Sequence, residues 1–396
     1  MENKAAQTGI MAAHYSVTPP ALANKTLAAR HRTAFMTTRT PVHFSEQPSG
    51  PSSAESDSRR ERLHAWAGEL LSRSDLAISV ASADASFRRY FRVAVSGGRP
   101  SDPSWIVMDA PPDKENLEPF IRVADMLVRA GVNAPRVLAQ NLDEGYLLLS
   151  DLGDHTYLSE LESAQSMRVD ELYADALDAL VGMQTRTPGA SELPPYDAAL
   201  LRREMELFPE WFLDKHLGIV VGSDIRAKLV ATFDALIESA LAQPRVFVHR
   251  DYHSRNLMVA GTAALGANPG VLDFQDAVYG PIAYDLVSLL RDCYIAWPID
   301  RVRGWVRRYR RSAAAAGLDA GGSEDTFMQW FDWMGVQRHL KAVGIFARLR
   351  HRDSKPGYIK DIPRTLSYIE TVASAYPPLR DLSVLIRDVV QPVFAP

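Results

Sequence analysis

The sequence predicts an α+β fold with two lobes: a small N-terminal lobe built on an antiparallel sheet and a larger, mainly helical C-terminal lobe. Three observations support this prediction. Short apolar runs of strand type, separated by turn residues, are concentrated before Gly153. Long segments with apolar residues at helical spacing fill most of the chain after Gly153. The 396 residues also exceed the length at which one hydrophobic core stops growing, roughly 250–300 residues.

Composition excludes several classes of protein. The formal net charge is −4, so no global basic field favours binding to nucleic acid. Cys293 is the only cysteine, which rules out an intrachain disulfide and a thiolate zinc cluster and indicates a reducing cytoplasm. No apolar stretch approaches the ~20 residues that span a membrane. We therefore expect a cytoplasmic protein with no nucleic-acid or membrane partner, and the sequence implies no obligate protein partner.

Residues 1–58 differ in composition from the rest of the chain. They contain few large aliphatic side chains and many Ser, Thr and Pro residues, so burial cannot offset the entropy lost on ordering. We predict a disordered tail. Two alternatives stay open: a transit peptide, because the early part is basic with Glu2 as its one acid, and an extended start site, with Met36 as the initiator.

Residues 59–152 are predicted to form the N-terminal lobe. The lobe starts with a helix that places Leu63, Trp66, Leu70 and Leu71 on one face. A second helix, in 115–131, is closed by Gly131, a typical residue just past a helix end. The predicted strands are 76–80, 90–95, 105–110, 136–141 and the strand in 146–153.

Residues 153–396 are predicted to form the helical lobe. Its helices are expected within 170–184, 200–218 and 225–243 and from Ile282 onward. The polar segment HRDYHSRN, residues 249–256, interrupts them and lies between two short apolar runs of strand type.

This polar segment carries a pattern typical of phosphoryl transfer. Asn256 follows Asp251 by five positions, and Asp273 stands at the end of the next apolar run. One aspartate that orients a hydroxyl, with an Asn and a second Asp that hold magnesium, is the smallest set for this chemistry. HRD-x4-N alone also fits a surface turn, but its combination with Asp273 and with the β-then-α order favours a kinase.

From about Leu63 to the C-terminal region the chain resembles the aminoglycoside phosphotransferase-like kinases, the small-molecule branch of the protein kinase fold. Four blocks, DASFRRYFRV, VHRDYHSRNLM, LDFQDAVYGPIAYDLVSLLRDCY and QRHLKAVGIFARL, resemble the bacterial N-acetylmuramate/N-acetylglucosamine anomeric kinases of cell-wall recycling. The resemblance implies a two-lobed protein-kinase-like fold. It also implies MgATP-dependent phosphorylation of the C1 hydroxyl of these sugars, feeding peptidoglycan recycling toward UDP-N-acetylmuramate.

The resemblance assigns roles to five residues of this sequence. Asp251 would be the catalytic aspartate, and Asn256 and Asp273 would bind Mg²⁺. Asp285 would brace the catalytic loop, and it also opens an apolar helix, where an acid is favoured by the helix dipole. His249 is expected to support the loop by packing.

ATP is expected between the lobes. Backbone groups of Ser150 and Leu152 would bind the adenine, and the turn at Ala85 and Ser86 would cover the phosphates, although it lacks G-x-G-x-x-G. Kinase-like folds also place a lysine on the third strand, where this chain has Met108. The residues expected to replace that lysine, if magnesium does not take over its role, are Arg92, Arg88 or Lys114.

The amino sugar is expected to meet two groups of residues. The first group, Gln275, Asp276 and Tyr279, follows Asp273 closely in the sequence. The second group lies on one face of a late helix, where a cationic side chain would bind the lactyl carboxylate of N-acetylmuramate: Arg338, Lys341 and Arg348. The alternative for this second group is a solvated basic face of an amphipathic helix.

Two other functions stay open. A kinase of another small alcohol, such as an aminoglycoside, choline or homoserine, would share Asp251, Asn256 and Asp273. A non-catalytic nucleotide-binding pseudokinase would account for the missing strand lysine.

Overall fold

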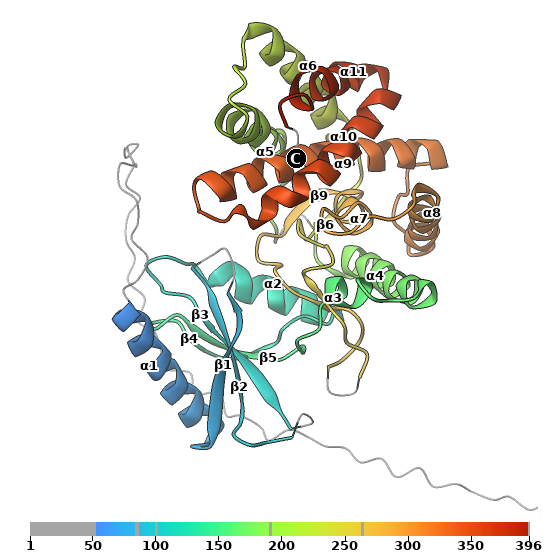
Figure 1. Ribbon diagram of the computed structural model, residues 1–396. Coiled ribbons are helices and arrows are strands. Elements are labelled where there is room, and N and C mark those ends of the chain that lie inside the picture. Colours follow the sequence, from blue (N-terminus) through green and yellow to red (C-terminus); the bar gives the residue numbers. More distant parts are fainter. Residues whose placement is uncertain (1–52, 84–86, 100–101, 190–191, 263–264, 395–396) are drawn as a thin grey trace, which may run out of the picture. The chain divides into compact units, whose positions relative to one another are not determined.

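The structure is a computed structural model that describes residues 53–83, 87–99, 102–189, 192–262 and 265–394 (Figure 1). Residues 53–396 form one compact unit. Its first helix, α1 (Ser53–Leu71), begins inside the segment predicted as a tail. The remainder of that segment, with both alternatives for it, lies outside the described residues. Within the described ranges, no helix combines the length and the hydrophobicity that crossing a membrane requires.

The predicted antiparallel sheet is confirmed. It has five strands in the order β1-β2-β3-β5-β4, and every neighbouring pair is antiparallel. Helix α2 (Glu118–Arg129) is followed by Gly131, whose φ of +73° is the left-handed conformation that a glycine accepts just past a helix end. The strands are β1 (Leu76–Ala83), β2 (Arg89–Val95), β3 (Ser104–Asp109), β4 (Val137–Asn141) and β5 (Tyr146–Ser150).

The two faces of this sheet belong to different cores, because side chains alternate along a strand. Val107 of β3 lies on the face that packs with Leu63 and Ala67 of α1. The next residue, Met108, lies on the opposite face and joins the large core that continues into the helical lobe. The sheet is therefore a platform with α1 on one side and the helical lobe on the other.

A buried carboxylate pins α1 to the sheet. Asp109, at the end of β3, has no exposed surface. Its Oδ1 accepts from Arg59 Nη2 of α1 at 2.6 Å, and its Oδ2 accepts from Arg89 Nε of β2 at 3.0 Å. A buried charge is tolerated only when it is paired, and here both partners are arginines from neighbouring elements.

The helical lobe also agrees with the prediction. Two pairs of short strands interrupt its helices, and they pair as β6 with β9 and β7 with β8. These strands are β6 (Arg245–Val248), β7 (Leu257–Met258), β8 (Gly270–Val271) and β9 (Val278–Pro281). The helices are α3 (Tyr157–Leu161), α4 (Ser166–Arg186), α5 (Ala198–Met205), η1 (Phe208–His216), α6 (Ser223–Leu241), α7 (Tyr284–Leu290), α8 (Ile299–Ala315), α9 (Glu324–His351), η2 (Pro356–Asp361), α10 (Ile362–Ala375), η3 (Pro377–Leu379), α11 (Arg380–Leu385) and η4 (Ile386–Val390).

Helix α9 is the longest helix described, with 28 residues. It packs against η1 at close range, because a Cβ added to Gly344 would overlap the backbone of Leu207. One turn earlier, Lys341 forms an ion pair with Glu204 of α5 at 3.1 Å. Two contacts three residues apart on both partners therefore set the position of α9 along its axis.

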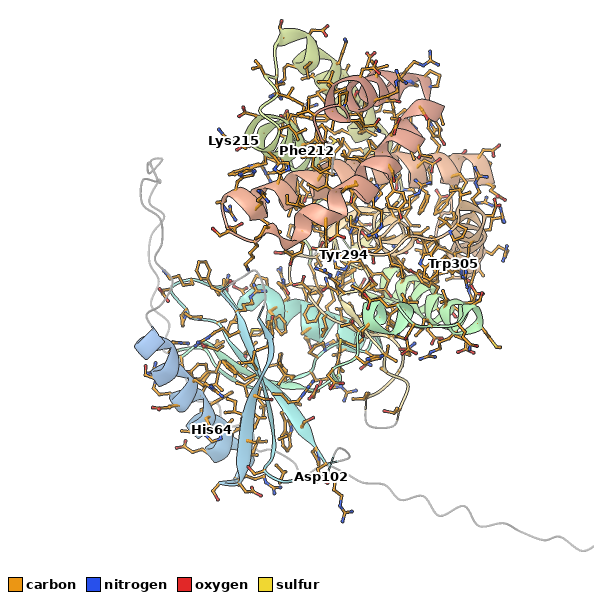
Figure 2. The ribbon with its side chains drawn as sticks, viewed as in Figure 1. His64, Asp102, Phe212, Lys215, Tyr294 and Trp305 are labelled. Atoms are coloured by element: carbon orange, nitrogen blue, oxygen red, sulfur yellow. The ribbon has the colours of Figure 1, made fainter. Side chains whose placement is uncertain are left out.

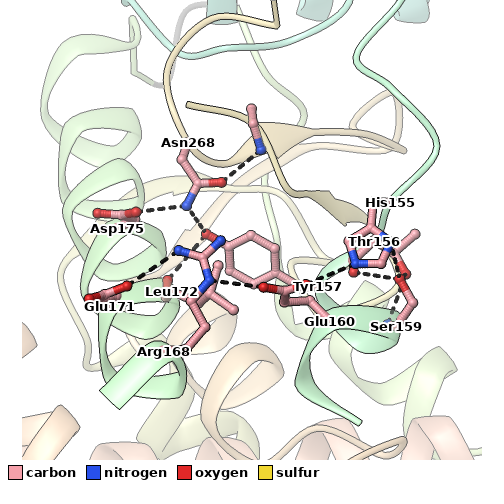
Figure 3. Close-up of polar contacts among 11 residues, drawn as sticks. His155, Thr156, Tyr157, Ser159, Glu160, Arg168, Glu171, Leu172, Asp175 and Asn268 are labelled. Atoms are coloured by element: carbon pink, nitrogen blue, oxygen red, sulfur yellow. Dashed lines mark hydrogen bonds and ion pairs between the residues drawn. The ribbon is translucent and has the colours of Figure 1, made fainter. Parts of the chain in front are cut away.

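The hairpin β7–β8 is anchored by Asn268, as Figure 3 shows. Its amide nitrogen donates to the hydroxyl of Tyr157 at 2.8 Å and to Asp175 Oδ2 at 2.7 Å. Its amide oxygen accepts from the backbone N–H of Ala260 at 2.9 Å. The hairpin is thereby tied to α3 and α4, which fixes the strands that precede Asp273 and follow Asn256.

Candidate active site

The polar segment predicted as the catalytic loop connects β6 to β7. Both strands pair with partners in the chain beyond, β6 with β9 and β7 with β8, so both ends of the loop are held. Arg250 has a φ of +79° and Asp273 a φ of +64°, an uncommon conformation for residues with a Cβ. Such conformations persist where the surrounding structure enforces them, and they are concentrated at functional sites.

Asp285 of α7 holds the start of the loop. Its carboxylate accepts from the backbone N–H of His249 at 2.6 Å and from that of Arg250 at 3.0 Å. Burial raises the pKa of Asp285 to about 7, although the two N–H donors act in the opposite direction. The contacts are with the loop backbone, which is the geometry that a bracing residue requires.

His249 is buried beside this brace. Its Nδ1 accepts from the backbone N–H of Asp251 at 3.3 Å, and burial lowers its pKa to about 4. The ring is therefore neutral at neutral pH. This contact places His249 in support of the loop, two residues before Asp251.

The structure brings Asp251, Asn256 and Asp273 together. The Asn256 amide nitrogen donates to the backbone carbonyl of Asp251 at 3.0 Å and to Asp273 Oδ2 at 3.3 Å. Gln275, another predicted site residue, donates from Nε2 to Asp273 Oδ1 at 2.8 Å. One amide and one carboxylate, both hard oxygen donors, thus stand side by side.

This donor set fits magnesium. In the described part of the chain no cluster of three His, Cys, Asp or Glu side chains is placed to hold a metal alone. Mg²⁺ usually takes one or two protein ligands and completes its shell with water and substrate phosphates. Asn256 and Asp273 are the residues that would hold it, and the remaining positions would be left to phosphate oxygens and water.

A network that the sequence did not reveal surrounds Glu204 of α5. This carboxylate is 5% exposed and pairs with Arg250 of the loop and Lys341 of α9. Tyr196 donates its hydroxyl to the same carboxylate. Burial opposes ionisation of Glu204, but Lys341 and Arg250 hold its pKa below the usual range. The catalytic loop and α9 are therefore joined through one buried anion.

A cavity of about 620 Å³ opens beside Asp251, Asn256 and Asp273. Three predicted cations of α9 line it: Arg338, Lys341 and Arg348. Arg338 is 5% and Lys341 7% exposed, so a solvated basic face is the wrong interpretation for these two. Gln275 and Asp276 also line the cavity, whereas Tyr279 does not. The Tyr279 ring instead packs under the guanidinium of Arg245, 5.4 Å from its centroid.

The cations next to Asp251 control its charge. Burial opposes ionisation of Asp251, yet Lys341, His253, Arg338 and Arg250 together hold its pKa below the usual value. An ionised carboxylate facing a cavity can accept a hydrogen bond from a hydroxyl of a bound molecule. The site is thus arranged to orient a hydroxyl next to the candidate metal ligands.

Of the five residues predicted to bind the nucleotide, the structure describes three. Ala85 and Ser86 lie outside the described residues. Arg92 does not line the cavity and is held by Asp151 at the end of the hinge, with Nε to Oδ2 at 2.6 Å. The Ser150 backbone N–H already donates to the Arg136 carbonyl at 3.0 Å. The side chain of Leu152 is buried and lies next to Gly270.

Arg88 is the cation best placed to act for the absent strand lysine. Met108 is fully buried and no lysine occurs in β3. Arg88 lines the cavity and pairs with Glu115 at 3.1 Å, and Glu115 lines it too. Lys114 lies outside that cavity, against the Phe87 ring at 5.8 Å.

Sequence reasoning missed several residues that line the cavity. Arg255 stands inside the predicted catalytic loop, Tyr294 ends the block LDFQDAVYGPIAYDLVSLLRDCY, and Tyr358 comes from a segment without a recognised pattern. Figure 2 labels Tyr294 among the segments of the helical lobe. The tyrosine rings could not be placed in advance because only the folded lobe brings them to Arg255.

Solved structures share the fold of this chain. The ADP-bound aminoglycoside phosphotransferase APH(2'')-Ib superposes with a TM-score of 0.52 at 13% identity, over 78% of this chain and 97% of that one. An ethanolamine kinase from Plasmodium vivax gives a TM-score of 0.54 at 12% identity, over 83% of this chain and 90% of that one. These similarities define a two-lobed protein-kinase-like fold of the small-molecule phosphotransferase type, as predicted.

Sequence comparison identifies the family. Residues 77–322 match the phosphotransferase enzyme family (APH), and this chain belongs to it. The N-acetylmuramate/N-acetylglucosamine kinase of Pseudomonas aeruginosa is 46% identical over 85% of this chain and 98% of its own length. The protein of the same name from Neisseria meningitidis is 43% identical over 84% of this chain and 96% of its own length.

Proposed function

We propose that this chain is a cytoplasmic kinase that transfers the γ-phosphoryl group of ATP to the anomeric (C1) hydroxyl of N-acetylmuramate and N-acetylglucosamine. The main support is the 43–46% identity to kinases named for these two sugars, over 96–98% of their lengths. The cavity fits an acceptor of this kind, because Asp251 and the candidate metal ligands meet cationic side chains there.

In this proposal Asp251 accepts a hydrogen bond from the C1 hydroxyl and takes its proton as the new P–O bond forms. Lys341 and Arg338 keep Asp251 ionised for that task. Asn256 and Asp273 hold Mg²⁺, which supplies neutralisation of charge on the transferred phosphoryl group when bound. The rate enhancement comes mainly from positioning and from fixed charges in a partly buried site.

The nucleotide would lie between the lobes. Backbone groups of Ser150 and Leu152 would bind the adenine, and the turn with Ala85 and Ser86 would cover the phosphates. We assign the role of the absent lysine to Arg88, because it shares the cavity with Asp273 and is oriented by Glu115. The Asp151 ion pair instead gives Arg92 a role in shaping the hinge.

A sugar 1-phosphate is the product of this reaction. It would feed cell-wall recycling toward UDP-N-acetylmuramate. The proposal requires ATP and the sugar as the partners of this chain, and it needs no nucleic acid, membrane or second protein.

The direct test measures ADP release from purified protein with MgATP and a panel of acceptors. We expect turnover with N-acetylmuramate and N-acetylglucosamine, and little with glucose, choline, homoserine or kanamycin. Phosphorus–proton coupling to H1 in the NMR spectrum of the product identifies the phosphorylated position. Phosphate on another oxygen contradicts anomeric transfer, preferred turnover of another alcohol supports that alternative, and no ADP with any acceptor supports a pseudokinase.

Asp251→Asn tests the catalytic assignment. The amide keeps the size of the side chain but cannot take a proton, so kcat should fall by about 10²–10⁴-fold. Steady-state kinetics with N-acetylglucosamine give this value, and thermal unfolding shows whether the fold is intact. A folded variant with near-normal kcat would remove Asp251 from the mechanism.

A further inference from the structure

Part of the cavity wall is formed by an arginine that lies close to two aromatic rings. The guanidinium carbon of Arg255 lies 3.8 Å from the ring centroid of Tyr294 and 5.4 Å from that of Tyr358. Phe346 stacks on Tyr358 with centroids 5.7 Å apart. These residues all line the cavity. Stacking on aromatic rings restricts the orientation of a guanidinium group while its N–H edges stay available for hydrogen bonds.

The cations that line the cavity fall into two groups. Arg88, Lys341 and Arg352 each form an ion pair with a carboxylate, at 3.1, 3.1 and 2.9 Å. The other group, Arg255, Arg338 and Arg348, forms no ion pair with any carboxylate in residues 53–83, 87–99, 102–189, 192–262 or 265–394. The Nε–H groups of Arg338 and Arg348 are also buried and donate to no acceptor among the described groups. Cations without an ion pair in a partly buried cavity favour an anion there.

The arginines without an ion pair do not all act on Asp251. Arg338 is among the charges that lower the pKa of Asp251. Arg348 follows it by ten residues on the same helix, a rise of roughly 15 Å. Burial lowers the pKa of Arg348, and the charges that act on it are those of Arg352, Asp353 and Glu210. The cavity therefore has a reacting end at Asp251 and a second cationic end at Arg348.

We propose that Arg255 and Arg348, with the rings of Tyr294 and Tyr358, form a subsite for a carboxylate on the acceptor. This inference rests on the proposed function and names the residues that distinguish its two sugars. N-acetylmuramate carries a lactyl ether on its C3 oxygen, two ring carbons from C1, and this ether ends in a carboxylate. N-acetylglucosamine has a neutral hydroxyl at C3. The C1 hydroxyl meets Asp251 while the carboxylate reaches the arginines, which can bind it with two N–H groups.

The sequence led us to expect the carboxylate at Arg338, Lys341 and Arg348; this assignment keeps Arg348, adds Arg255 and gives Arg338 and Lys341 another role. Lys341 already pairs with Glu204 at 3.1 Å and donates to the Tyr284 hydroxyl at 3.0 Å. Binding a second anion would compete with that network. Lys341 and Arg338 therefore act on the charge of Asp251, and the carboxylate is left to Arg255 and Arg348.

The test compares an acidic with a neutral acceptor in wild type and in two variants, Arg255→Gln and Arg348→Gln. Acceptors are N-acetylmuramate, its uncharged methyl ester and N-acetylglucosamine. We expect the ratio of kcat/KM for N-acetylmuramate to that for N-acetylglucosamine to fall at least tenfold in each variant. The ratio of kcat/KM for N-acetylmuramate to that for its methyl ester should also fall. Arg350→Gln, on the same helix but exposed, is the matched control and should keep the wild-type ratio.

Three further measurements decide between outcomes. Thermal unfolding reports whether each variant is folded, and Arg348→Gln tests the subsite independently if Arg255→Gln does not fold. Arg255→Lys keeps the charge without the planar fork and should recover only part of the ratio. A rise in KM for ATP with an unchanged sugar ratio would overturn the proposal, because the arginines would then bind nucleotide phosphate. Equal losses for acid, ester and N-acetylglucosamine would also overturn it.

Failure of the subsite can be distinguished from failure of the proposed function. Calorimetric binding of N-acetylmuramate and of its methyl ester needs no turnover. If wild type binds the acid more tightly than the ester and Arg255→Gln removes the difference, the subsite holds even where phosphorylation of C1 is not found. If turnover occurs while acid and ester bind and react alike, the kinase assignment holds and the subsite is excluded.

Discussion

Two buried carboxylates, each held by two cations, stand in different lobes and have different consequences. Asp109 forms ion pairs with Arg59 of α1 and Arg89 of β2. Glu204 forms ion pairs with Arg250 of the predicted catalytic loop and Lys341 of α9. Neither Asp109 nor its arginines line the cavity, whereas Lys341 does and Arg250 immediately precedes Asp251. Similar ion-pair chemistry attaches a helix to a sheet in one lobe and, in the other, holds the loop that carries the proposed catalytic residue Asp251.

The largest expected effect is that of Glu204→Gln. Removing the anion leaves Arg250 and Lys341 buried without a counter-charge, which should lower the free energy of unfolding by about 3–5 kcal/mol. The loop and α9 also lose their common anchor, so kcat should fall by about 10²-fold. Denaturant unfolding and steady-state kinetics on the same preparation measure both.

Glu204→Asp keeps the charge but shortens the side chain, and serves as the control for charge alone. It should recover more of the stability than of kcat. If Glu204→Gln loses stability but retains wild-type kcat, Glu204 is only a structural counter-ion and the contrast with Asp109 disappears.

Asp109→Asn is the matched change in the other lobe. It also leaves two arginines with a neutral partner, so the free energy of unfolding should fall by about 3 kcal/mol. The Arg89 side chain is 29% exposed, more than that of Arg250 at 18% or Lys341 at 9%, and water lessens the loss. The folded variant should keep a kcat close to wild type, and a large fall in kcat would show that the sheet transmits strain to the site.

The last effect is a gradual change with pH and concerns Asp285, a third buried carboxylate, which has no cation within ion-pair distance among the described residues. Its folded-state pKa of about 7 lies above the ordinary value of 3.8. The folded state therefore binds the extra proton between these values. The contribution of Asp285 to the free energy of unfolding should fall as pH rises through this window, by at most about 1.4 kcal/mol per pH unit.

The measurement is the stability of wild type relative to Asp285→Asn, followed from pH 4 to 8 by denaturant unfolding. Because Asn does not titrate, the difference isolates this group. The advantage of wild type should shrink toward pH 7 and then level off. A constant difference would show that Asp285 has an ordinary pKa in the folded protein.

The sequence could predict features that depend on residues close together along the chain, and it could not predict contacts between distant segments. The strands that flank 249–256 and the grouping of Asp251, Asn256 and Asp273 follow from short patterns along the chain. Glu204 lies in a helix with no distinguishing neighbours, and its partners come from a loop and a helix far along the sequence. Nothing in the segment around Glu204 indicates that it will be buried next to two cations.

Helix α9 gives a second example of what the sequence alone could not predict. Helical spacing placed Arg338, Lys341 and Arg348 on one face, and all three line the cavity. Spacing alone could not decide between a solvated face and a buried one, because that depends on what packs over the helix. Proximity in sequence also misled for Tyr279: it follows Asp273 closely but lies on β9, where its ring faces Arg245.

The contact between Gly344 and the Leu207 backbone has a consequence for how acceptor preference could change during evolution. Because position 344 has no side chain, α9 packs closely against the backbone at Leu207. The ion pair of Lys341 with Glu204 opposes a shift of the helix along its axis. Exchanging the side chain at position 348 would then alter what the cavity recognises without disturbing how the helix is seated. Selectivity could drift at that position while the geometry around Asp251 stayed constant.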